Sequence, residues 1–373
     1  MKSKIFLISL CCLVLTACSL FQSSRGPRHS WDSQKHQGIY LKTISFPTQD
    51  NGWVAGKGGI IWHSNNGGST WTPQSTPTQE TLNKIFFFNT QEGLAVGSTG
   101  VIVYTEDGGR TWGPRPSNTN SNLNDVFFLN DTQGWIVGDG SVVLTTSNGG
   151  QSWASQSIGS ASTNLFSIYF VDSNHGWIVG ASGEIWVTTN GGSLWGPQYS
   201  NTGQDLRSVY FIDQNKGFAA GGEGFTAGGV PSLDRRVVGT VLAHRLLLRT
   251  DDGGANWNPV INREGDPFHR VVFVDADHGW LVAGGEYYVS EQVPVGNQTG
   301  PTGAIYFTAD GGSNWNPQYQ GLVEPVYDIW FLDTNKGFAV GADTTSKFLN
   351  PGIRTDIGPD VTRILKTTNG GRP

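Results

Sequence analysis

Seven copies of one short pattern, Ser/Thr-x-Asp/Asn-Gly-Gly, place a carboxylate or an amide at intervals along the chain. Asp107, Asp252 and Asp310 could act as general acids or bind calcium. The other four copies have asparagine at this position, at Asn66, Asn148, Asn190 and Asn369. Asparagine would remove the acid but preserve a turn in which the side chain accepts backbone N–H groups and Gly-Gly supplies positive φ. The pattern therefore predicts structural turns, here called Asp boxes.

Other chemistry has little support in the sequence. The seven histidines show no metal-ligand spacing, and all three cysteines lie within the first 18 residues, so we predict no metal and no cofactor. The glycine-rich stretch 221–224 invites a phosphate-binding interpretation, but no helix is predicted after it. A glycosidase needs two carboxylates, and no spacing singles out a pair among Glu223, Asp234, Glu286, Glu324 and Asp328.

The composition is typical of a large, turn-rich, all-β protein. Glycine accounts for 52 of the 373 residues, aromatic residues for 12% and charged residues for only 14%. The formal net charge is −6. An acidic balance argues against general nucleic-acid binding, which needs a basic face.

The N-terminus resembles the signal of a bacterial lipoprotein. Lys2 and Lys4 precede an apolar stretch, residues 5–15, that is too short for a stable membrane span. It ends in Leu-Thr-Ala-Cys at residues 15–18, which is similar to a lipobox. We predict a signal peptide at 1–17, lipidation of Cys18 and a polar tether at 18–28; the alternative is an ordinary secretory signal that contains a cysteine. Because Ser19 follows Cys18, the resemblance implies an outer-membrane anchor.

A second pattern precedes each Asp box. It consists of an apolar strand of the form L-x-x-I-x-F, a turn, and then Gly-aromatic-x-Val-Gly, as at 123–128 and 134–138. Each repeat therefore reads as four short strands joined by tight turns. Four-stranded units of about 40 residues are the signature of propeller blades, so seven repeats predict a seven-bladed β-propeller with antiparallel blades.

Tryptophans predict how the ring closes. Six Asp boxes are completed by a tryptophan, which lies 11 or 12 residues before the next repeat, at Trp71, Trp112, Trp153, Trp195, Trp257 and Trp315. The seventh box, at 367–371, has none, but Trp31 lies 10 residues before the first repeat. We therefore expect the segment at Trp31 to supply the outermost strand of the last blade, within a single propeller at 29–373. All seven tryptophans are expected to pack between neighbouring blades.

The last three repeats carry insertions. From the glycine that opens the second strand to the box Ser/Thr, the distance is 12 residues in the first four repeats, and then 33, 29 and 30 residues. The insertions lie near 222–243, 284–302 and 342–361. Because each falls between the second and third strands, all three should share the face opposite the Asp boxes. Long loops on a rigid scaffold commonly carry function, although neutral surface growth is the alternative.

Arginine and tyrosine, which are enriched at protein-contact hot spots, occur in and beside these insertions. We expect Arg207 and Arg270, at the starts of first strands, to reach the same face. The predicted partner-binding residues are Arg207, Arg235, Arg236, Arg245, Arg270, Tyr287 and Tyr288.

The two patterns together, as at 170–180 and 105–112, resemble the photosystem II stability/assembly factor family, whose propellers have Asp-box (BNR-like) repeats. The resemblance covers nearly all of 29–373. It implies a monomeric, non-enzymatic propeller that binds a newly made reaction-centre subunit through a basic patch on one face, and cyanobacterial members are lipoproteins. No residue of that patch can be assigned to a position in this chain.

We therefore predict a scaffold anchored in the cell envelope that binds a membrane-associated protein on its insertion-bearing face. The resemblance implies a thylakoid or plasma membrane location, and a photosystem partner, in a photosynthetic source. The alternative is a glycan-binding or sialidase-like glycoside-hydrolase propeller, because Asp boxes also resemble those of sialidases. The Arg-Ile-Pro motif usual in sialidases is absent from the sequence.

Overall fold

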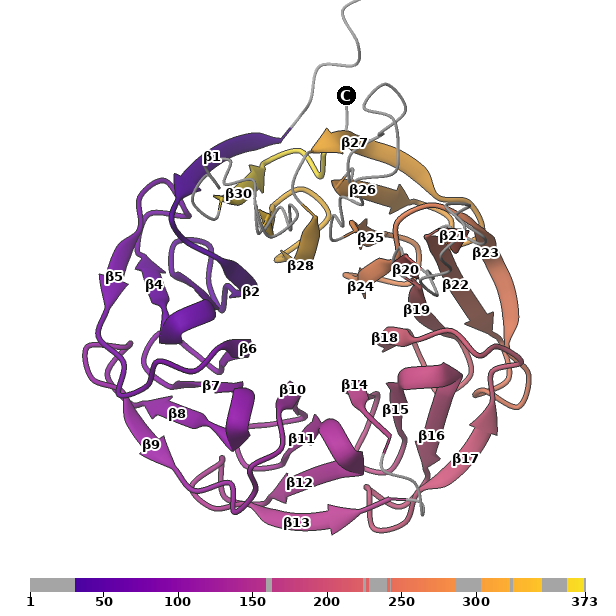
Figure 1. Ribbon diagram of the computed structural model, residues 1–373, viewed down its shortest axis with the longest axis horizontal. Helices are drawn as coiled ribbons and strands as arrows, with labels where there is room; N and C mark the ends of the chain where they lie inside the picture. Colours follow the sequence, from indigo (N-terminus) through magenta and orange to yellow (C-terminus); the bar gives the residue numbers. More distant parts are fainter. Residues whose placement is uncertain are drawn as a thin grey trace, which may run out of the picture.

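The computed structural model describes residues 31–158, 163–223, 226–227, 240–241, 243–285, 303–322, 325–343 and 361–371. Within these residues, seven four-stranded antiparallel sheets stand around a common axis, which confirms the predicted propeller (Figure 1). Each first strand lies nearest the axis and each fourth strand lies at the rim. None of the helices in the described part of the chain has the length and apolar character that crossing a membrane requires.

Blades 1 to 4 are compact, with a 3-10 turn between the second and third strands. Blade 1 contains β2 (Leu41–Ser45), β3 (Gly52–Gly56), η1 (Lys57–Gly59), β4 (Ile61–Ser64) and β5 (Thr72–Gln74). Blade 2 contains β6 (Leu82–Phe87), β7 (Gly93–Gly97), η2 (Ser98–Gly100), β8 (Ile102–Thr105) and β9 (Gly113–Arg115). Blade 3 contains β10 (Leu123–Phe128), β11 (Gly134–Gly138), η3 (Asp139–Ser141), β12 (Val142–Thr146) and β13 (Ala154–Ser157). Blade 4 contains β14 (Leu165–Phe170), β15 (Gly176–Gly180), η4 (Ala181–Gly183), β16 (Glu184–Thr188) and β17 (Gly196–Tyr199).

Blades 5 to 7 carry the insertions. Blade 5 contains β18 (Leu206–Phe211), β19 (Gly217–Glu223), β22 (His244–Thr250) and β23 (Asn258–Glu264), with a separate pair formed by β20 (Thr226–Ala227) and β21 (Thr240–Val241). Blade 6 contains β24 (Phe268–Phe273), β25 (Gly279–Ala283), β26 (Gly303–Thr308) and β27 (Asn316–Leu322). Blade 7 contains β28 (Val326–Phe331), β29 (Gly337–Asp343), β30 (Val361–Thr367) and β1 (Asp32–Gln37).

The N-terminal strand closes the ring, as predicted. β1 pairs antiparallel with β30, from Asp32 opposite Lys366 to Gln37 opposite Val361. Figure 1 shows this meeting of the indigo and yellow ends of the described chain. Trp31 is only 4% exposed, and its ring meets the Phe331 ring edge-on at 5.9 Å. β1 thus covers the edge that β30 would otherwise present and gives blade 7 its fourth strand.

One phenylalanine forms the centre of each junction between blades. Phe87 of blade 2 stacks on Trp53 of blade 1 at 3.6 Å and meets its own Asp-box tryptophan, Trp112, edge-on at 5.8 Å. Stacked and edge-on aromatic contacts stabilise a core beyond the apolar area that they bury. At the second junction, Leu94 takes the place of the stacked aromatic residue. The corresponding phenylalanines at the other junctions are Phe46, Phe128, Phe170, Phe211, Phe273 and Phe331.

Both glycines of the Gly-aromatic-x-Val-Gly pattern are required by close packing. A Cβ on Gly134 would lie 2.5 Å from the ring of Phe128, which covers this glycine. A Cβ on Gly138 would overlap the carbonyl oxygen of Asn122, where the chain enters β10. The two glycines are thus needed because the first and second strands of a blade approach closely at both ends.

The Asp boxes are hydrogen-bonded turns. Thr105 Oγ1 accepts from the Gly109 amide at 2.8 Å and donates to Asp107 Oδ1 at 2.9 Å, and the same carboxylate oxygen accepts from the Thr111 amide. The Thr111 hydroxyl also donates to this carboxylate and contributes most to lowering its pKa. Together these bonds lower the pKa of Asp107 to about 2. Asn148 accepts the Ser152 amide in the same way, as expected of a structural turn.

We predict that Gly134→Ala destabilises the protein whereas Gly113→Ala does not. Over-packing a core typically costs about 1–3 kcal/mol, and the added methyl would displace Phe128 from its junction. Gly113, in β9, is a matched control, because a Cβ at this position would have no atom within 4 Å and its φ is not positive. Urea unfolding of both variants measures the difference. Equal free energies of unfolding would contradict the packing account.

Candidate functional site

Side chains from the third residue of each first strand meet around the axis and form an ionic belt. In blade order, the belt consists of Thr43, Lys84, Asp125, Ser167, Ser208, Arg270 and Asp328. All are buried except Arg270, whose side chain is 25% exposed. The belt therefore places two cations and two carboxylates among three hydroxyl side chains close to the axis.

Most belt residues bond to the next blade through its first strand. Thr43 Oγ1 accepts the Ile85 amide at 3.2 Å, and Ser208 Oγ accepts the Val271 amide at 3.1 Å. Asp125, Ser167 and Asp328 accept the amides of Ile168, Val209 and Ile44, respectively. These bonds satisfy amides of the first strands, which form the inner edge of each sheet and so have one side without a neighbouring strand. Buried groups of this kind are costly to leave unpaired.

Lys84 and Arg270 break this series because their side chains only donate. Each is followed, one blade later, by an aspartate that accepts the amide of the next residue in its own strand. Asp125 Oδ1 accepts from Val126 at 3.1 Å, and Asp328 Oδ1 accepts from Ile329 at 3.0 Å. An aspartate therefore follows each cation in the belt, because its carboxylate accepts the amide hydrogen that the preceding lysine or arginine cannot accept.

The four charged groups of the belt join opposite sides of the ring. Lys84 Nζ lies 2.7 Å from Asp328 Oδ2. Arg270 lies in blade 6, yet its Nη1 is 3.4 Å from Asp125 Oδ2 in blade 3, and its Nε is 3.7 Å from Asp328 Oδ1. The guanidinium therefore crosses the axis, and two positive charges balance two negative ones.

The belt fixes the protonation of Asp328. Burial alone would raise the pKa of this carboxyl, but the charges of Lys84 and Arg270 outweigh it and hold the pKa below its ordinary value. Burial, followed by the charge of Arg270, lowers the pKa of Lys84 against the opposing effect of the carboxylates. Asp328 is therefore ionised at neutral pH and unsuited to donate a proton as a general acid.

The position of Arg270 corrects our expectation. The sequence predicts that it reaches the insertion-bearing face, but as the third residue of β24 it points into the channel, where two carboxylates hold it. Its role in partner binding stays a prediction.

The channel mouth on the insertion-bearing face is mainly polar. The second residues of the first strands surround it, and all are partly exposed: Lys42, Asn83, Asn124, Phe166, Arg207, His269 and Tyr327. The Arg207 side chain is 31% exposed and lies 4.0 Å from Asp205 Oδ2. Burial, with the charge of Arg207, lowers the pKa of His269 to about 3, so its imidazole is neutral.

Arg245 packs between blades 5 and 6. It follows His244 at the start of β22, where β19 pairs with β22 over three more residues than the second and third strands pair in the compact blades. Its guanidinium donates to the Tyr306 hydroxyl and lies 5.9 Å from the ring centroids of both Phe268 and Tyr306. Arg245 thus links blade 5 to blade 6 through contacts with Tyr306 and Phe268.

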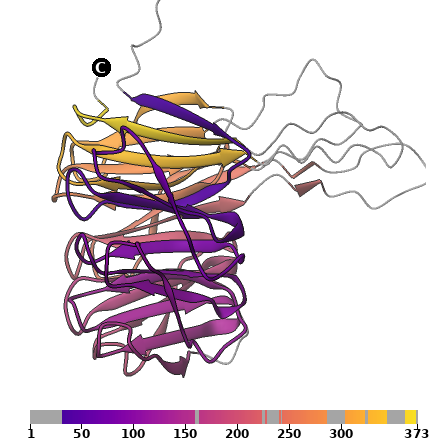
Figure 2. The same cartoon turned by 90° about the vertical axis from the view of Figure 1, so that its left-hand side faces the viewer.

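The rest of the predicted site lies outside the described residues. This holds for Cys18, Arg235, Arg236, Tyr287 and Tyr288, and for most of the three insertions. The parts of the insertions that are described show where they begin. β19 and β29 extend to Glu223 and Asp343, and β20 and β21 project from one face of the ring in Figure 2.

Sequence reasoning missed a glutamine bridge at the rim. Gln74 Nε2 donates to the Gly108 carbonyl of the next blade at 2.9 Å, and Gln74 Oε1 accepts from Trp112 Nε1 at 3.1 Å. The signal is a Trp-x-x-Gln pattern, in which the glutamine follows the Asp-box tryptophan by three residues. The equivalent residues that reach a glycine carbonyl of the next Asp box are Gln34, Gln198 and Gln318.

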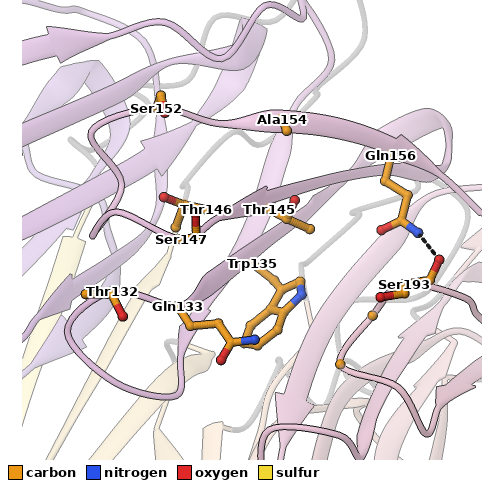
Figure 3. A pocket seen from close by; sticks show the side chains of 12 residues that line it. Thr132, Gln133, Trp135, Thr145, Thr146, Ser147, Ser152, Ala154, Gln156 and Ser193 are labelled. Carbon is orange, nitrogen blue, oxygen red and sulfur yellow. Dashed lines mark hydrogen bonds between the residues drawn. The ribbon is translucent and has the colours of Figure 1, made fainter.

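The bridge differs between blades 3 and 4, where a hollow of about 610 Å³ opens (Figure 3). Gln156 Nε2 there donates to the Ser193 carbonyl at 3.1 Å. Trp135 borders the hollow but is 1% exposed and stacks on Phe170 at 3.8 Å, so its face is not offered to a ligand. None of the described residues that line the hollow is ionisable, so they supply no acid or base.

No group of three or more histidine, cysteine, aspartate and glutamate side chains that could hold a metal ion occurs among the residues the structure describes.

We predict that Lys84 and Asp328 are strongly coupled. Lys84→Met leaves one belt cation against two carboxylates, and Asp328→Asn leaves two cations against one, whereas the double variant is balanced. Breaking a buried pair typically costs about 3–5 kcal/mol, and removing both partners costs far less than twice that. Urea unfolding of the three variants measures the coupling, and strictly additive losses would contradict the belt.

Comparison with known proteins gives a consistent picture of the fold. Residues 70–161 match the family model described as Photosynthesis system II assembly factor YCF48. No curated protein matches the chain. Among solved structures, "YCF48 bound to D1 peptide" is 16% identical, with a TM-score of 0.63 over 91% of this chain and 95% of that one. "YCF48 from Cyanidioschyzon merolae" is 17% identical, with a TM-score of 0.60 over 90% and 98%.

A structure of an ancestral GH74 enzyme is also similar, at 15% identity and a TM-score of 0.56, over 83% of this chain but only 45% of that one. At these identities, likeness to solved structures shows the fold. Together with the family-model match over residues 70–161, it supports a YCF48-like propeller with BNR repeats.

Proposed function

We propose that this chain is a non-enzymatic scaffold, anchored to a membrane through Cys18, that binds a membrane-associated protein on its insertion-bearing face. The observation that carries the proposal is the likeness to YCF48, in the match of residues 70–161 and in the similarity of nearly the whole chain to YCF48 bound to a D1 peptide. In a photosynthetic source the partner would be a photosystem subunit. The location would be the cell envelope, in the outer membrane or in the thylakoid or plasma membrane of a cyanobacterium.

The insertion-bearing face suits a protein partner. Two cations, Lys42 and Arg207, lie at its channel mouth, and Lys42 Nζ donates to Asn83 Oδ1 at 3.0 Å. The strands that lead into two insertions extend beyond the ring, to Glu223 and Asp343. Arg235, Arg236, Tyr287 and Tyr288 belong to the insertions, and arginine and tyrosine are residue types that commonly dominate protein contacts.

The described carboxylates support a non-enzymatic role. Of the candidates for a glycosidase pair, Asp328 is held ionised by Lys84 and Arg270 in the belt. Glu223 lies at the exposed end of β19, and Asp234, Glu286 and Glu324 lie outside the described residues. Inverting and retaining glycosidases both need a carboxyl group that can deliver a proton to the leaving oxygen.

A glycan-binding role is the second candidate, and the likeness to GH74 structures favours it. The chain spans about half the length of those enzymes, at 45% of one and 55% of another. The hollow between blades 3 and 4 offers hydroxyl and amide groups but no exposed aromatic face on Trp135.

Crosslinking and affinity capture from membranes of the source organism test the proposal. We expect the intact protein to capture a membrane protein, and the variant Arg207→Ala/Arg235→Ala/Arg236→Ala to capture at least tenfold less of it. These substitutions remove charge from the insertion-bearing face without touching Arg245, whose guanidinium packs between blades.

The matched control is Arg110→Ala/Arg115→Ala/Lys216→Ala, which removes three cations from the turns and rim on the Asp-box side. It should capture the partner as well as the intact protein does. Equal loss from both triple variants, or no loss from either, would contradict binding on the insertion-bearing face. Binding of the intact protein to a glycan array would instead support the second candidate, a glycan-binding role.

A further inference from the structure

The opposite end of the channel, on the Asp-box side, has a different chemistry. The fifth and seventh residues of the segments that begin with each first strand lie beyond the ionic belt. The fifth residues are Ser45, Phe86, Phe127, Tyr169, Tyr210, Val272 and Trp330, and the seventh are Pro47, Phe88, Leu129, Val171, Ile212, Val274 and Leu332. We call these fourteen residues the apolar mouth. Every seventh residue is partly exposed.

Ring contacts between neighbouring blades join the aromatic residues of the apolar mouth in blades 3 to 5. Tyr169 lies 5.2 Å from Phe127 and 4.5 Å from Tyr210 between ring centroids. Tyr210 donates its hydroxyl hydrogen to the Phe273 carbonyl at 2.8 Å, which turns its polar end into the blade. Phe86 and Phe88 meet edge-on at 5.2 Å. Aromatic rings therefore border the channel from blade 2 to blade 5.

A hollow of about 410 Å³ opens in this mouth. It lies between blades 7, 1, 2 and 3, and its walls include Pro47, Phe86, Phe88, Leu129 and Trp330. Partly exposed aromatic and aliphatic side chains around a concave site are what a protruding apolar side chain needs for burial. At about 25 cal/mol per Å² of apolar area, burying one large side chain there would supply a few kcal/mol.

Acidic residues surround the apolar mouth. The eighth residue of four segments is an aspartate, at Asp172, Asp213, Asp275 and Asp333, in the turns between first and second strands. Each accepts amides of its own turn, as Asp213 Oδ1 does from Asn215 at 2.7 Å and Lys216 at 2.8 Å. Backbone bonds of this kind hold the pKa of Asp275 below its ordinary value despite partial burial, so it stays ionised.

The remaining charges on these seven turns do not neutralise the rim. Asp50, Glu92, Asp131 and Asp277 add four acids, against the two lysines Lys216 and Lys336. His175 and His278 contact Asp172 and Asp275 at 3.0 and 2.9 Å. The mouth is thus an apolar hollow inside an acidic rim, whereas the other end of the channel carries Lys42 and Arg207.

We propose that the apolar mouth binds a peptide segment of a protein partner that has an aromatic or aliphatic side chain flanked by lysine or arginine. The apolar side chain would enter the hollow beside Phe88 and Leu129, and the flanking cations would lie over the aspartates of the rim. Charge complementarity selects this occupant over an acidic segment, because like charges would meet at the rim. The site is separate from the insertion-bearing face and does not depend on the function proposed for that face.

Binding of labelled synthetic peptides tests this inference. The probe is a fluorescein-labelled hexapeptide with tryptophan and leucine between two pairs of lysines, followed by fluorescence anisotropy. Two comparison peptides replace the lysines with glutamates, or the two apolar residues with serines. We expect binding of the first peptide only, and its affinity should fall as salt is raised because the charges are exposed.

The chain itself provides a matched pair of charge variants. Asp213→Asn/Asp275→Asn/Asp333→Asn removes three rim charges, and the turns should persist because asparagine fills the same position at Asn89 and Asn130. Asp107→Asn/Asp252→Asn/Asp310→Asn removes three charges from Asp boxes on the same side but further from the axis, where asparagine also occurs naturally.

We expect the rim variant to bind the basic apolar peptide at least tenfold more weakly, and the Asp-box variant to bind it within about twofold of the intact protein. Equal weakening by both would show attraction to the overall charge alone and overturn the site. Binding of the serine peptide as tightly as the apolar one would overturn the role of the hollow, and failure of the basic apolar peptide to bind would overturn the inference.

Discussion

The phenylalanine at the end of each first strand lies over the glycine that opens the second strand, and the arrangement of the blades depends on this contact. The ring of Phe128 covers Gly134, so no other residue fits beneath it. Its two neighbours are a large apolar side chain of the preceding blade and the tryptophan of its own Asp box. The box turn places that tryptophan, and Trp31 takes the same place for blade 7. Seven equivalent junctions thus make the ring rigid.

A rigid ring permits a channel whose chemistry changes along its axis. Apolar junctions exclude water from the blades, so the buried amides near the axis must find acceptors within the protein. The belt supplies them, and the two donor-only residues, Lys84 and Arg270, are each followed by an aspartate. This ionic layer separates a mouth with two partly exposed cations from an apolar mouth with an acidic rim. The two mouths of the channel are thus chemically unlike.

The repeated residues made the fold predictable, but the ionic belt could not be predicted because its residues do not repeat. The seven-bladed ring and its closure by Trp31 follow from residues that recur at fixed spacing because every junction needs them. The belt residues Lys84, Asp125, Arg270 and Asp328 occupy equivalent positions but differ in type, and they contact one another across the ring, so no local spacing indicates them. The prediction that Arg270 reaches the insertion-bearing face is wrong for this reason. Arg245 is predicted to be available to a partner, but its planar guanidinium packs against Tyr306 and Phe268 instead.

Ring closure is tested most directly by hydrogen–deuterium exchange on a chain that begins at Ile39 and so lacks Trp31 and β1. The account predicts that amides of β30 and β29 exchange much faster than in the full chain, because β30 becomes an edge and Phe331 loses its tryptophan. Blades 3 and 4 should keep their protection, and a synthetic peptide of residues 31–38 should restore slow exchange in β30. Unchanged exchange in β30 without β1 would contradict the account.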